Sequence, residues 1–598
     1  MLPSSGSMLP SSSSITCVHA PRCPGCPLIG RPYPEGLASK AAHLDVAFAR
    51  YPELATVERL PVVPADVVVN YRLRAKLVAD ERGHLGLYAA GSHDVVDIPH
   101  CRVMAPELSR VAQALRELLP LELPLTGVDL RLCDRGVLVC LVVTGQPAKH
   151  AVERCRDSLI ARLPQLAGLA VSFRKPGAVQ MLGTELTLLS GPEAQPHHLY
   201  PGGVWHYASH GAFTQVHSTR AAWLHERIQA LLEQGNGLAG LRVLELYAGS
   251  GALALRLAAA GARVTAVESF APALERLGNA ASAQALTLET WCGDAEEFLA
   301  GLNVEGVAAP RFDAVLVNPP RRGLTPNVRM RLAELAPARI VYVSCEPETL
   351  ARDLSHFAAL GYSCDGVQGL DMIPLSESLE SVVALEQKPA ARPRVLFEDA
   401  CSLALDKLPF EATARQGTLE RDLLARARQA LGLPELTPVH RLDRDTSGVC
   451  WFARRPDDVP ALAAALAEGE LRIVALAHGV VREKGKINRP IRDGAKAKPA
   501  QTRYRRDAVI GGHSLLSVWT EHSRKHQLRR HLASIRHPVV GDARYGQRAT
   551  NLHFEHRHGL ERTFLHCASL RVDLGAGPVE IRSELAGDLA AVLDSLRR

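Results

Sequence analysis

Cys345 ends the string VYVSC, and a Glu-Pro turn follows it. Such a run of β-branched and aromatic residues predicts a strand. A cysteine at the carboxyl end of a strand can act as a nucleophile through its thiol if a ligand binds at that end of the sheet. The alternative is an inert cysteine in a buried core. The motifs expected at the same edge of the sheet, described next, favour a nucleophile over a buried core cysteine.

The string NPPRRG, from Asn318 to Gly323, follows the predicted strand DAVLV. Open α/β sheets bind their ligands at the carboxyl ends of the strands, where this string lies. Its two prolines fix a rigid turn, and that turn carries one amide and two arginines. A turn of this kind suits a planar base held by hydrogen bonds. We therefore expect NPPRRG and Cys345 to line one crevice.

A glycine-rich turn joins a strand to a helix in VLELYAGSGALALRLAAAGARVTAVE. Gly249 and Gly251 let the backbone approach a ligand, and the helix that follows offers free N–H donors. Glu268 ends the next strand, near the spacing at which an acid binds a ribose hydroxyl. This turn alone fits a dinucleotide dehydrogenase as well as an S-adenosylmethionine methyltransferase. NPPRRG together with Cys345 favours the methyltransferase.

The chain of 598 residues is several times the usual domain size, so several domains must position these residues. Strands alternate with helical segments in one part, which predicts a doubly wound, Rossmann-like parallel sheet within a multidomain α/β and α+β protein. The expected order is a disordered leader (1–14), a cysteine segment (15–35), a β-rich domain (36–210), the Rossmann-like domain (211–388), a linker (389–394) and a C-terminal domain with a mixed β-sheet (395–598).

Composition narrows the class of protein. No stretch approaches the roughly 18 apolar residues that a membrane helix needs, and 47% hydrophobic residues exclude a wholly disordered chain. The 13 cysteines and the polar start, which has no apolar core, suggest reduced thiols in a cytoplasmic protein. From Ala391 onward the chain has 35 Lys and Arg against 25 Asp and Glu, a net charge of +10, and the rest is −4. This asymmetry fits a polyanion as partner of the C-terminal domain, and on charge alone it fits a merely solvated surface about as well.

Three cysteines, Cys17, Cys23 and Cys26, lie within ten residues among prolines and a glycine that prevent regular structure. Thiolates so close on a bent loop can converge on one metal centre. A fourth ligand is required, and Cys101 in DIPHCRVM is the best candidate because its setting is also polar and rich in turns. Four cysteines by themselves fit zinc and a 4Fe-4S cluster equally.

Residues 15–388 resemble the RNA (uracil-5-)-methyltransferases, and most of all the 23S rRNA branch that lacks an N-terminal TRAM domain. The resemblance rests on the cysteine spacing, NPPRRG, YVSCEPETLARD and two cofactor motifs, FTQVH and ELYAGSG. It implies S-adenosylmethionine as cofactor and a 4Fe-4S cluster on the four cysteines. The residues it implies for S-adenosylmethionine are Gln215, Glu245, Tyr247, Gly249, Gly251, Glu268 and Asn318. His217 stands where the family has Asn.

The same resemblance implies a covalent mechanism. Carbon 5 of uracil is a poor nucleophile, so the Cys345 thiolate adds to carbon 6 and activates carbon 5 for methylation. The adduct then loses its carbon-5 proton to a general base. LDMIPLSESLESVVAL aligns with the family segment that carries this base, which implies Glu380. Ser378 stands where that segment has His.

Residues 394–590 resemble the RluA-type pseudouridine synthases. The string HRLDRDTSG (440–448) is a highly specific match, and TEHSRKHQLRRHLASIRHPVVGDARYG (520–546) adds a dense cationic segment. The resemblance implies Asp443 as the catalytic aspartate and Arg524 as its ion partner, with no cofactor. Ile473 replaces the tyrosine that stacks on the target base in that family.

The sequence therefore predicts a bifunctional enzyme that methylates and isomerises uridines in RNA. The expected partner is 23S rRNA, with tRNA as a second substrate for the C-terminal domain, and neither a membrane nor a protein partner is predicted. The alternative makes the C-terminal domain an inactive platform that binds RNA for the methyltransferase. Ile473 favours the alternative, and the intact HRLDRDTSG string opposes it.

Overall fold

The computed structural model describes residues 14–597 except for 119–122, 146–148, 176–179, 184, 201, 213–214, 236, 303–310, 389–391, 415–421, 494–495, 521–523 and 576. The predicted leader therefore lies almost wholly outside the described residues. So do the first half of the predicted linker and the first two residues of FTQVH. Among the described helices, none is both long and apolar enough to cross a membrane.

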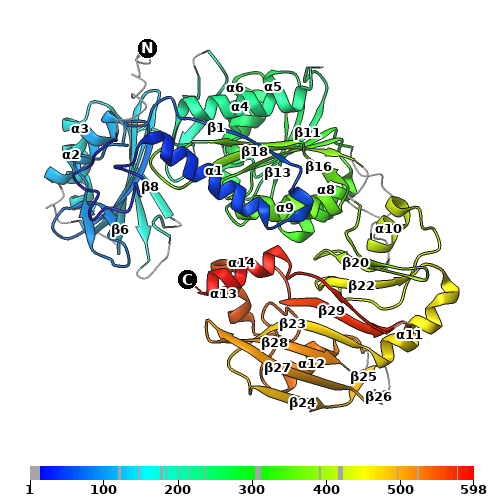
Figure 1. Cartoon of the computed structure of the whole chain (residues 1–598). Coiled ribbons are helices and arrows are strands. Elements are labelled where there is room, and N and C mark those ends of the chain that lie inside the picture. The colour runs from blue at the N-terminus through cyan, green and yellow to red at the C-terminus, as the bar shows by residue number, and fades with distance from the viewer. Residues whose placement is uncertain are drawn as a thin grey trace.

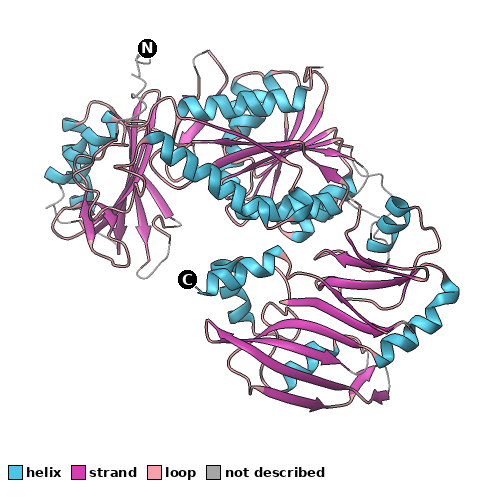
Figure 2. Ribbon diagram, in the orientation of Figure 1, coloured by secondary structure: helices cyan, strands magenta, loops and turns pink. Residues whose placement is uncertain are grey.

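The first domain is a seven-stranded sheet with two helices, α2 (Pro106–Leu118) and α3 (Lys149–Arg162), packed on it (Figures 1 and 2). Its apolar core includes Val111, Leu115 and Val139, all fully buried. In order across the sheet the strands are β4 (Val95–Asp97), β3 (Leu85–Tyr88), β2 (Arg74–Ala79), β5 (Leu125–Cys133), β6 (Gly136–Thr144), β7 (Leu166–Arg174) and β8 (Glu185–Ser190).

The segment 36–210, expected to be mostly β, also contributes elements to the next domain. Helix α1 (Tyr33–Ala49) buries Leu44, Ala47 and Phe48, spaced as one helical face, in the core of the central domain. After a short helix η1 (Pro52–Leu54), strand β1 (Glu58–Val63) pairs in parallel with the central sheet. The expected boundary at 210 missed these elements because their partners lie some 300 residues away in sequence.

The central domain is a Rossmann-like sheet covered on both faces, which confirms that part of the predicted fold. Helices α4 (Ser218–Glu233), α5 (Ala252–Ala259) and α6 (Ala271–Ala283) pack on one face, and α1, α7 (Ala295–Gly301), α8 (Pro326–Leu335) and α9 (Pro347–Ala359) on the other. The strand order is β1, β17 (Gly366–Leu370), β18 (Glu380–Gln387), β15 (Arg339–Ser344), β14 (Ala314–Val317), β11 (Arg242–Leu246), β12 (Arg263–Glu268) and β13 (Glu289–Cys292). A short strand, β16 (Tyr362–Ser363), pairs with β18, and the hairpin of β9 (Ala194–His198) and β10 (Trp205–Ser209) precedes the domain.

Strand direction explains why the motifs meet. Strands β15, β14, β11, β12 and β13 are parallel neighbours, so the residues that follow them gather at one edge. Strand β18 is antiparallel to β15, so its first residue, Glu380, comes to that same edge.

The C-terminal domain is a ten-stranded mixed sheet, as expected from the strand-rich sequence. Its main path runs β19 (Val395–Glu398), β20 (Ser402–Lys407), β22 (Ser447–Ala453), β29 (Leu565–Asp573), β23 (Glu470–Ala477), β28 (His513–Thr520), β27 (Gln501–Ile510) and β24 (Lys484–Asn488). Strands β21 (Thr437–Pro438) and β30 (Pro578–Arg582) join its side, and β25 (Ile491–Asp493) pairs with β26 (Lys496–Lys498). The helices are α10 (Leu423–Leu431), α11 (Val459–Glu468), α12 (Gln527–Ser534), α13 (Arg548–His558) and α14 (Gly587–Arg597), with the short η2 (Pro456–Asp458).

Candidate active sites

Cys345 and Glu380 lie side by side, because Ser344 of β15 pairs with Ser381 of β18. Glu380 is 9% exposed, and burial raises its pKa to about 7, although the Arg321 guanidinium opposes the rise. Burial also raises the pKa of Cys345 to about 11, Glu380 adds to this, and Arg321 again opposes it. A thiol, a carboxyl group and one guanidinium therefore share a single site.

Helix α9 holds the NPPRRG turn from behind. Thr349 Oγ1 donates a hydrogen bond to the Arg321 carbonyl at 3.0 Å, and Arg352 Nη2 donates one to the Arg322 carbonyl at 2.8 Å. Gly323 has a φ of +74°, and a Cβ there would lie 2.6 Å from Arg352 Nη2 and 2.7 Å from Asp353 Oδ2. Only glycine fits both the backbone conformation and the close approach, which explains the last residue of the motif.

The glycine-rich turn and Glu268 lie together. The backbone N–H groups of Gly249 and Phe270 donate to the two carboxylate oxygens of Glu268, each at 2.9 Å. Gly249 has a φ of +57° and open space where a side chain would stand, whereas a Cβ on Gly251 would lie 2.2 Å from Leu277. Gly251 thus packs the helix against its neighbour, and Gly249 leaves room for a ligand.

Glu245 is the buried acid of this edge. It is 2% exposed on β11, and its Oε2 has no hydrogen-bond partner among the described residues. Burial raises its pKa to about 8, with a contribution from Glu268. A buried oxygen without a partner costs free energy unless a polar ligand meets it. These features fit a bound S-adenosylmethionine, which carries hydroxyl and ammonium donors.

The other predicted cofactor residues follow two of these strands or precede a helix of the domain. Tyr247 follows β11 with a φ of +64°, Asn318 directly follows β14, and Gln215 precedes α4. Asp294, which the sequence reasoning missed, follows β13 and caps α7 through the Glu296 N–H at 2.8 Å. Burial, and next the charge of Asp294, raise the pKa of Tyr247. The signal that could have found Asp294 is an acid two residues after the end of the third strand in the alternating pattern.

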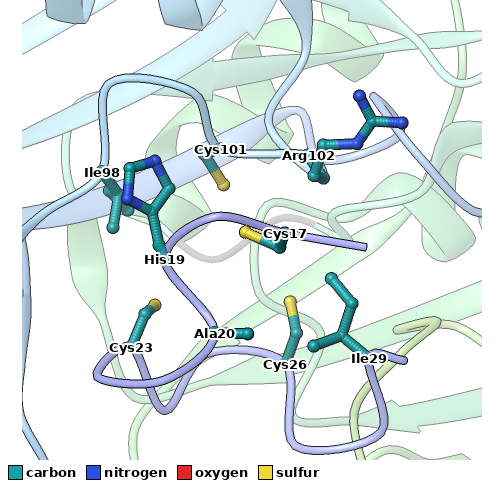
Figure 3. Close-up of a pocket in the computed structure, with 9 residues that line it drawn as sticks. All are labelled: Cys17, His19, Ala20, Cys23, Cys26, Ile29, Ile98, Cys101 and Arg102. Carbon is teal, nitrogen blue, oxygen red and sulfur yellow. The ribbon is translucent and has the colours of Figure 1, made fainter. Parts of the chain in front are cut away.

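Cys17, Cys23, Cys26 and Cys101 line one cavity, as the sequence predicts for three neighbours and a distant fourth (Figure 3). All four sulfur atoms point toward the space that the cysteines enclose. Burial raises the pKa of Cys26 to about 12, with contributions from the other three thiols. Four converging thiols in a shielded cavity fit either tetrahedral zinc or an iron-sulfur cluster.

The cysteine segment also contacts the segment that leads to Glu380. The Leu28 N–H donates to the Leu375 carbonyl at 3.1 Å, and Tyr71 OH donates to the Pro374 carbonyl at 3.2 Å. Lys40 of α1 forms a buried ion pair of 2.6 Å with Asp371. The cysteine segment therefore packs against the loop that precedes the candidate base.

In the C-terminal domain, Asp443 pairs with Arg529 and not with Arg524, which corrects the predicted ion partner. Arg529 Nη1 lies 3.4 Å from Asp443 Oδ2, and its Nε and Nη2 lie 2.7 and 2.8 Å from the Asp542 carboxylate. The Nε of Arg524 has no hydrogen-bond partner among the described residues. Arg529 lies five residues after Arg524, in helix α12, and from this helix its side chain reaches Asp443. Strand and loop patterns in the sequence do not predict the direction of that side chain.

The loop that carries Asp443 is ordered by side chains from elsewhere in the domain. Arg562 Nη1 donates to the Asp445 carbonyl at 2.7 Å, and its Nη2 donates to Ser447 Oγ at 3.0 Å. The Thr446 N–H donates to the Asp443 carbonyl at 2.9 Å. Ile473 lies on β23, opposite Val518 of β28. The loop thus has the fixed geometry of a site and not of a solvated surface turn.

Two family models match separate parts of the chain: residues 204–388 match tRNA (Uracil-5-)-methyltransferase, and residues 403–534 match RNA pseudouridylate synthase. An uncharacterised RNA methyltransferase of Geobacter sulfurreducens is 32% identical over 390 residues, which are 62% of this chain and 77% of that protein. Another, from Nitratidesulfovibrio vulgaris, is 28% identical over 393 residues, or 62% and 82% of the two chains.

Two solved structures align with parts of the chain. The tRNA (uracil-54, C5)-methyltransferase of Pyrococcus abyssi, in complex with S-adenosyl-L-homocysteine, is 25% identical, with a TM-score of 0.49, over 61% of this chain and 86% of that one. Human RNA pseudouridylate synthase domain containing 1 is 21% identical, with a TM-score of 0.28, over 32% and 83%. From the family models and the Geobacter relative, the chain belongs to the S-adenosylmethionine-dependent RNA (uracil-5-)-methyltransferase family and carries a C-terminal RNA pseudouridylate synthase domain.

Proposed function

We propose that the protein is a bifunctional enzyme that methylates carbon 5 of one uridine in 23S rRNA and converts another uridine to pseudouridine. The methyl-transfer half rests above all on the proximity of Cys345 and Glu380, in a site that Arg321 shares. A nucleophile and a base on adjacent strands are what a covalent route through carbon 6 requires.

In this route the Cys345 thiolate forms a bond to carbon 6 of the uracil, and carbon 5 becomes an enolate-like nucleophile. Bound S-adenosylmethionine supplies the methyl group that carbon 5 takes. Glu380 then removes the carbon-5 proton, the ring regains its double bond, and the bond between Sγ and carbon 6 breaks. Arg321 favours the ionised forms of both protein groups, because its charge opposes the rise of their pKa values.

The residues proposed to hold the cofactor are Gln215, Glu245, Tyr247, Gly249, Gly251, Glu268 and Asn318. All but Gln215 lie at or after the ends of β11, β12 and β14. Cys17, Cys23, Cys26 and Cys101 are proposed to hold a 4Fe-4S cluster, and the choice of iron over zinc follows the resemblance to the 23S branch. Its role is structural, since the cysteine segment contacts the loop before Glu380 through Leu28 and Leu375 and methyl transfer includes no redox step.

For the second activity we propose Asp443 as the catalytic aspartate. Its carboxylate attacks the ribose carbon 1 and forms an ester as the glycosidic bond breaks, or it takes the proton of the neighbouring ribose carbon. The freed uracil rotates, and its carbon 5 bonds to carbon 1 as the ester breaks or the ribose proton returns. Carbon 5 then loses its proton, and N1 takes one up. The Arg529 guanidinium lies 3.4 Å from this carboxylate and forms an ion pair with it. No cofactor takes part.

A second candidate function for the C-terminal domain is RNA binding without catalysis. Ile473 favours it, because a stacked tyrosine contributes about 1 to 3 kcal/mol to base binding and isoleucine lacks that face. Both candidates use the basic residues between Arg482 and Arg506, on and around β24 and β27, to bind phosphates.

Two variants separate these proposals. Ribosomal and transfer RNA from strains that carry Cys345→Ala or Asp443→Asn are mapped for 5-methyluridine and pseudouridine. We expect Cys345→Ala to lose one 5-methyluridine in 23S rRNA, and Asp443→Asn to lose one pseudouridine in the same rRNA loop while methylation continues. If Asp443→Asn loses no pseudouridine, the platform function replaces the enzymatic one. If the pseudouridine is lost only from tRNA, the proposal that both domains modify the same rRNA loop is wrong, and the isomerase assignment stands.

A further inference from the structure

Glu561 and Arg562, between α13 and β29, are neighbours whose side chains serve different domains. The Glu561 carboxylate accepts a hydrogen bond from Arg329 Nη2 at 2.9 Å and forms an ion pair with Arg352 Nη1 at 3.1 Å. Both arginines belong to the methyltransferase domain, where their side chains are 0% and 10% exposed. Glu561 therefore brings a carboxylate of the synthase domain into the other domain.

The two arginines also hold the NPPRRG turn. Arg352 donates to the Arg322 carbonyl, and both arginines pair with Asp353, which is fully buried. Asp353 Oδ2 accepts the Leu324 N–H at 2.8 Å and the hydroxyl of Tyr342, on the strand that leads to Cys345, at 2.7 Å. The arginines that pair with Asp353 behind the turn thus also pair with Glu561, so the four side chains form one connected ionic cluster.

Charge makes Glu561 part of this cluster. Arg329 and Arg352 bring two positive charges to a shielded position, and Asp353 brings one negative charge. Glu561 supplies the second negative charge and balances the set. A buried charge without a partner is strongly unfavourable, so the arginines would shift if the carboxylate were removed, and the turn that they hold would shift with them.

A second contact joins helix α8 to the loop that carries Asp443. Arg444, next to Asp443, donates from Nε to the Phe410 carbonyl at 3.1 Å and contacts Met330 Sδ through Nη2. The Phe410 ring lies 5.5 Å from the guanidinium of Arg329. The synthase domain therefore holds two successive residues of α8, the helix that follows the NPPRRG turn.

Arg562 has its partners inside the synthase domain. Besides the Asp445 carbonyl and Ser447 Oγ, its guanidinium pairs with Asp588 at 2.6 Å. The anchor of the Asp443 loop thus does not depend on the carboxylate of Glu561. A substitution of Glu561 should therefore affect the methyl-transfer site, whereas a substitution of Arg562 should affect the Asp443 loop.

We propose that Glu561 is a positioning residue for methyl transfer, so that the synthase domain completes the base-binding turn of the methyltransferase. This rests on the proposed function, in which Arg321 of the NPPRRG turn shares the site of Cys345 and Glu380, and on the expectation from the sequence that this turn holds the target base. The methyltransferase then depends on the docked C-terminal domain whether or not that domain isomerises uridine.

The test compares full-length Glu561→Gln with the native enzyme on rRNA isolated from a strain that lacks the enzyme. The expected result is a fall of about tenfold in kcat/KM for RNA methylation, carried by KM for RNA, in the range of couplings through packed networks. KM for S-adenosylmethionine stays unchanged. Glu561→Asp, which keeps the charge, recovers part of the loss. Glu555→Gln, an exposed glutamate on neighbouring α13, is the matched control and behaves like the native enzyme.

Several outcomes overturn the inference. Native kinetics in Glu561→Gln would do so, and so would equal losses of methylation and pseudouridine formation with a lower Tm, which mean a general structural role. If Glu561→Gln does not fold, Arg352→Lys replaces it, since lysine keeps the charge but loses the guanidinium fork. A native KM for RNA in that variant rejects the inference. Methylation by Cys345→Ala would instead reject the proposed function, whatever Glu561→Gln does.

Discussion

Cys345 and Glu380 stand together because β15 and β18 run in opposite directions and pair Ser344 with Ser381. The residue after one strand therefore faces the residue that starts the other. Arg321, from the turn after β14, lowers the pKa of both groups against the effect of burial. This arrangement has consequences for activity, pH dependence and stability that can be measured.

Replacement of each partner is expected to stop the reaction at a different stage. Cys345→Ala abolishes methyl transfer, because no adduct forms. Glu380→Gln forms the adduct but cannot remove the carbon-5 proton, so protein crosslinked to RNA accumulates and is seen as a slower band on a denaturing gel. Cys401→Ser, at an exposed cysteine, is the control. Normal turnover by Cys345→Ala would refute the mechanism.

Methyl transfer is expected to rise with pH through about 7, the pKa to which burial raises Glu380. The base acts in its ionised form, so the rate is low below this pH, and ionisation of Cys345, with a pKa of about 11, continues the rise at higher pH. Arg321→Met removes the charge that favours ionisation and moves the profile to higher pH. Arg331→Met, at a surface arginine paired with Glu334, leaves the profile in place. A single-turnover pH profile that is flat between pH 6 and 8 would contradict the assignment.

Glu245 is expected to make stability depend on pH. Its pKa is raised in the folded state to about 8 from 4.5, so the folded protein holds this proton more tightly than the unfolded chain. Its contribution to the free energy of unfolding therefore falls as pH rises from about 4.5 to about 8. In the absence of cofactor, Glu245→Gln, which stays neutral, should have the native Tm near pH 4.5 and a higher Tm than the native protein above pH 8. A Tm difference independent of pH would show that the carboxyl does not titrate in this window.

Substitution by Ser is expected to remove iron from anaerobically purified protein at any one of the four positions Cys17, Cys23, Cys26 and Cys101. Methylation should also weaken, because the cysteine segment contacts Leu375 in the loop before Glu380. Metal analysis and the absorption band near roughly 400 nm measure the first effect. Cys401→Ser serves again as control. Stoichiometric zinc without iron would refute the cluster.

The ion pair of Asp443 predicts which arginine matters for pseudouridine formation. Arg529→Met removes the guanidinium 3.4 Å from Asp443 and should reduce the rate by about tenfold or more, since a charge-assisted bond to a catalytic carboxylate is lost. Arg524→Met should have the smaller effect. Tritium release from labelled uridine in RNA measures both rates. The reverse order would restore Arg524 as the partner.

Local sequence patterns were sufficient to predict the Rossmann-like sheet and the edge of that sheet at which most of the proposed site residues gather. Alternating strands and helices can be recognised along the chain, and motifs such as NPPRRG mark the strand ends where ligands bind. Glu268 and Gly249 illustrate this, since they lie 19 residues apart and meet through one strand crossover. The convergence of three near cysteines with Cys101 was equally predictable, because four thiols are needed around one metal.

Contacts between distant segments were decided only in the tertiary structure. Helix α1 and strand β1 pack in the central domain, Arg529 and not Arg524 reaches Asp443, and Glu561 meets Arg329 across 232 residues. The reason is physical: periodicity tells which face of an element is buried, but not which surface buries it. That choice depends on shape and charge complementarity among all the elements together. The sequence alone therefore determined the chemistry available to each domain, and the tertiary structure decided which charges meet and how the two domains touch.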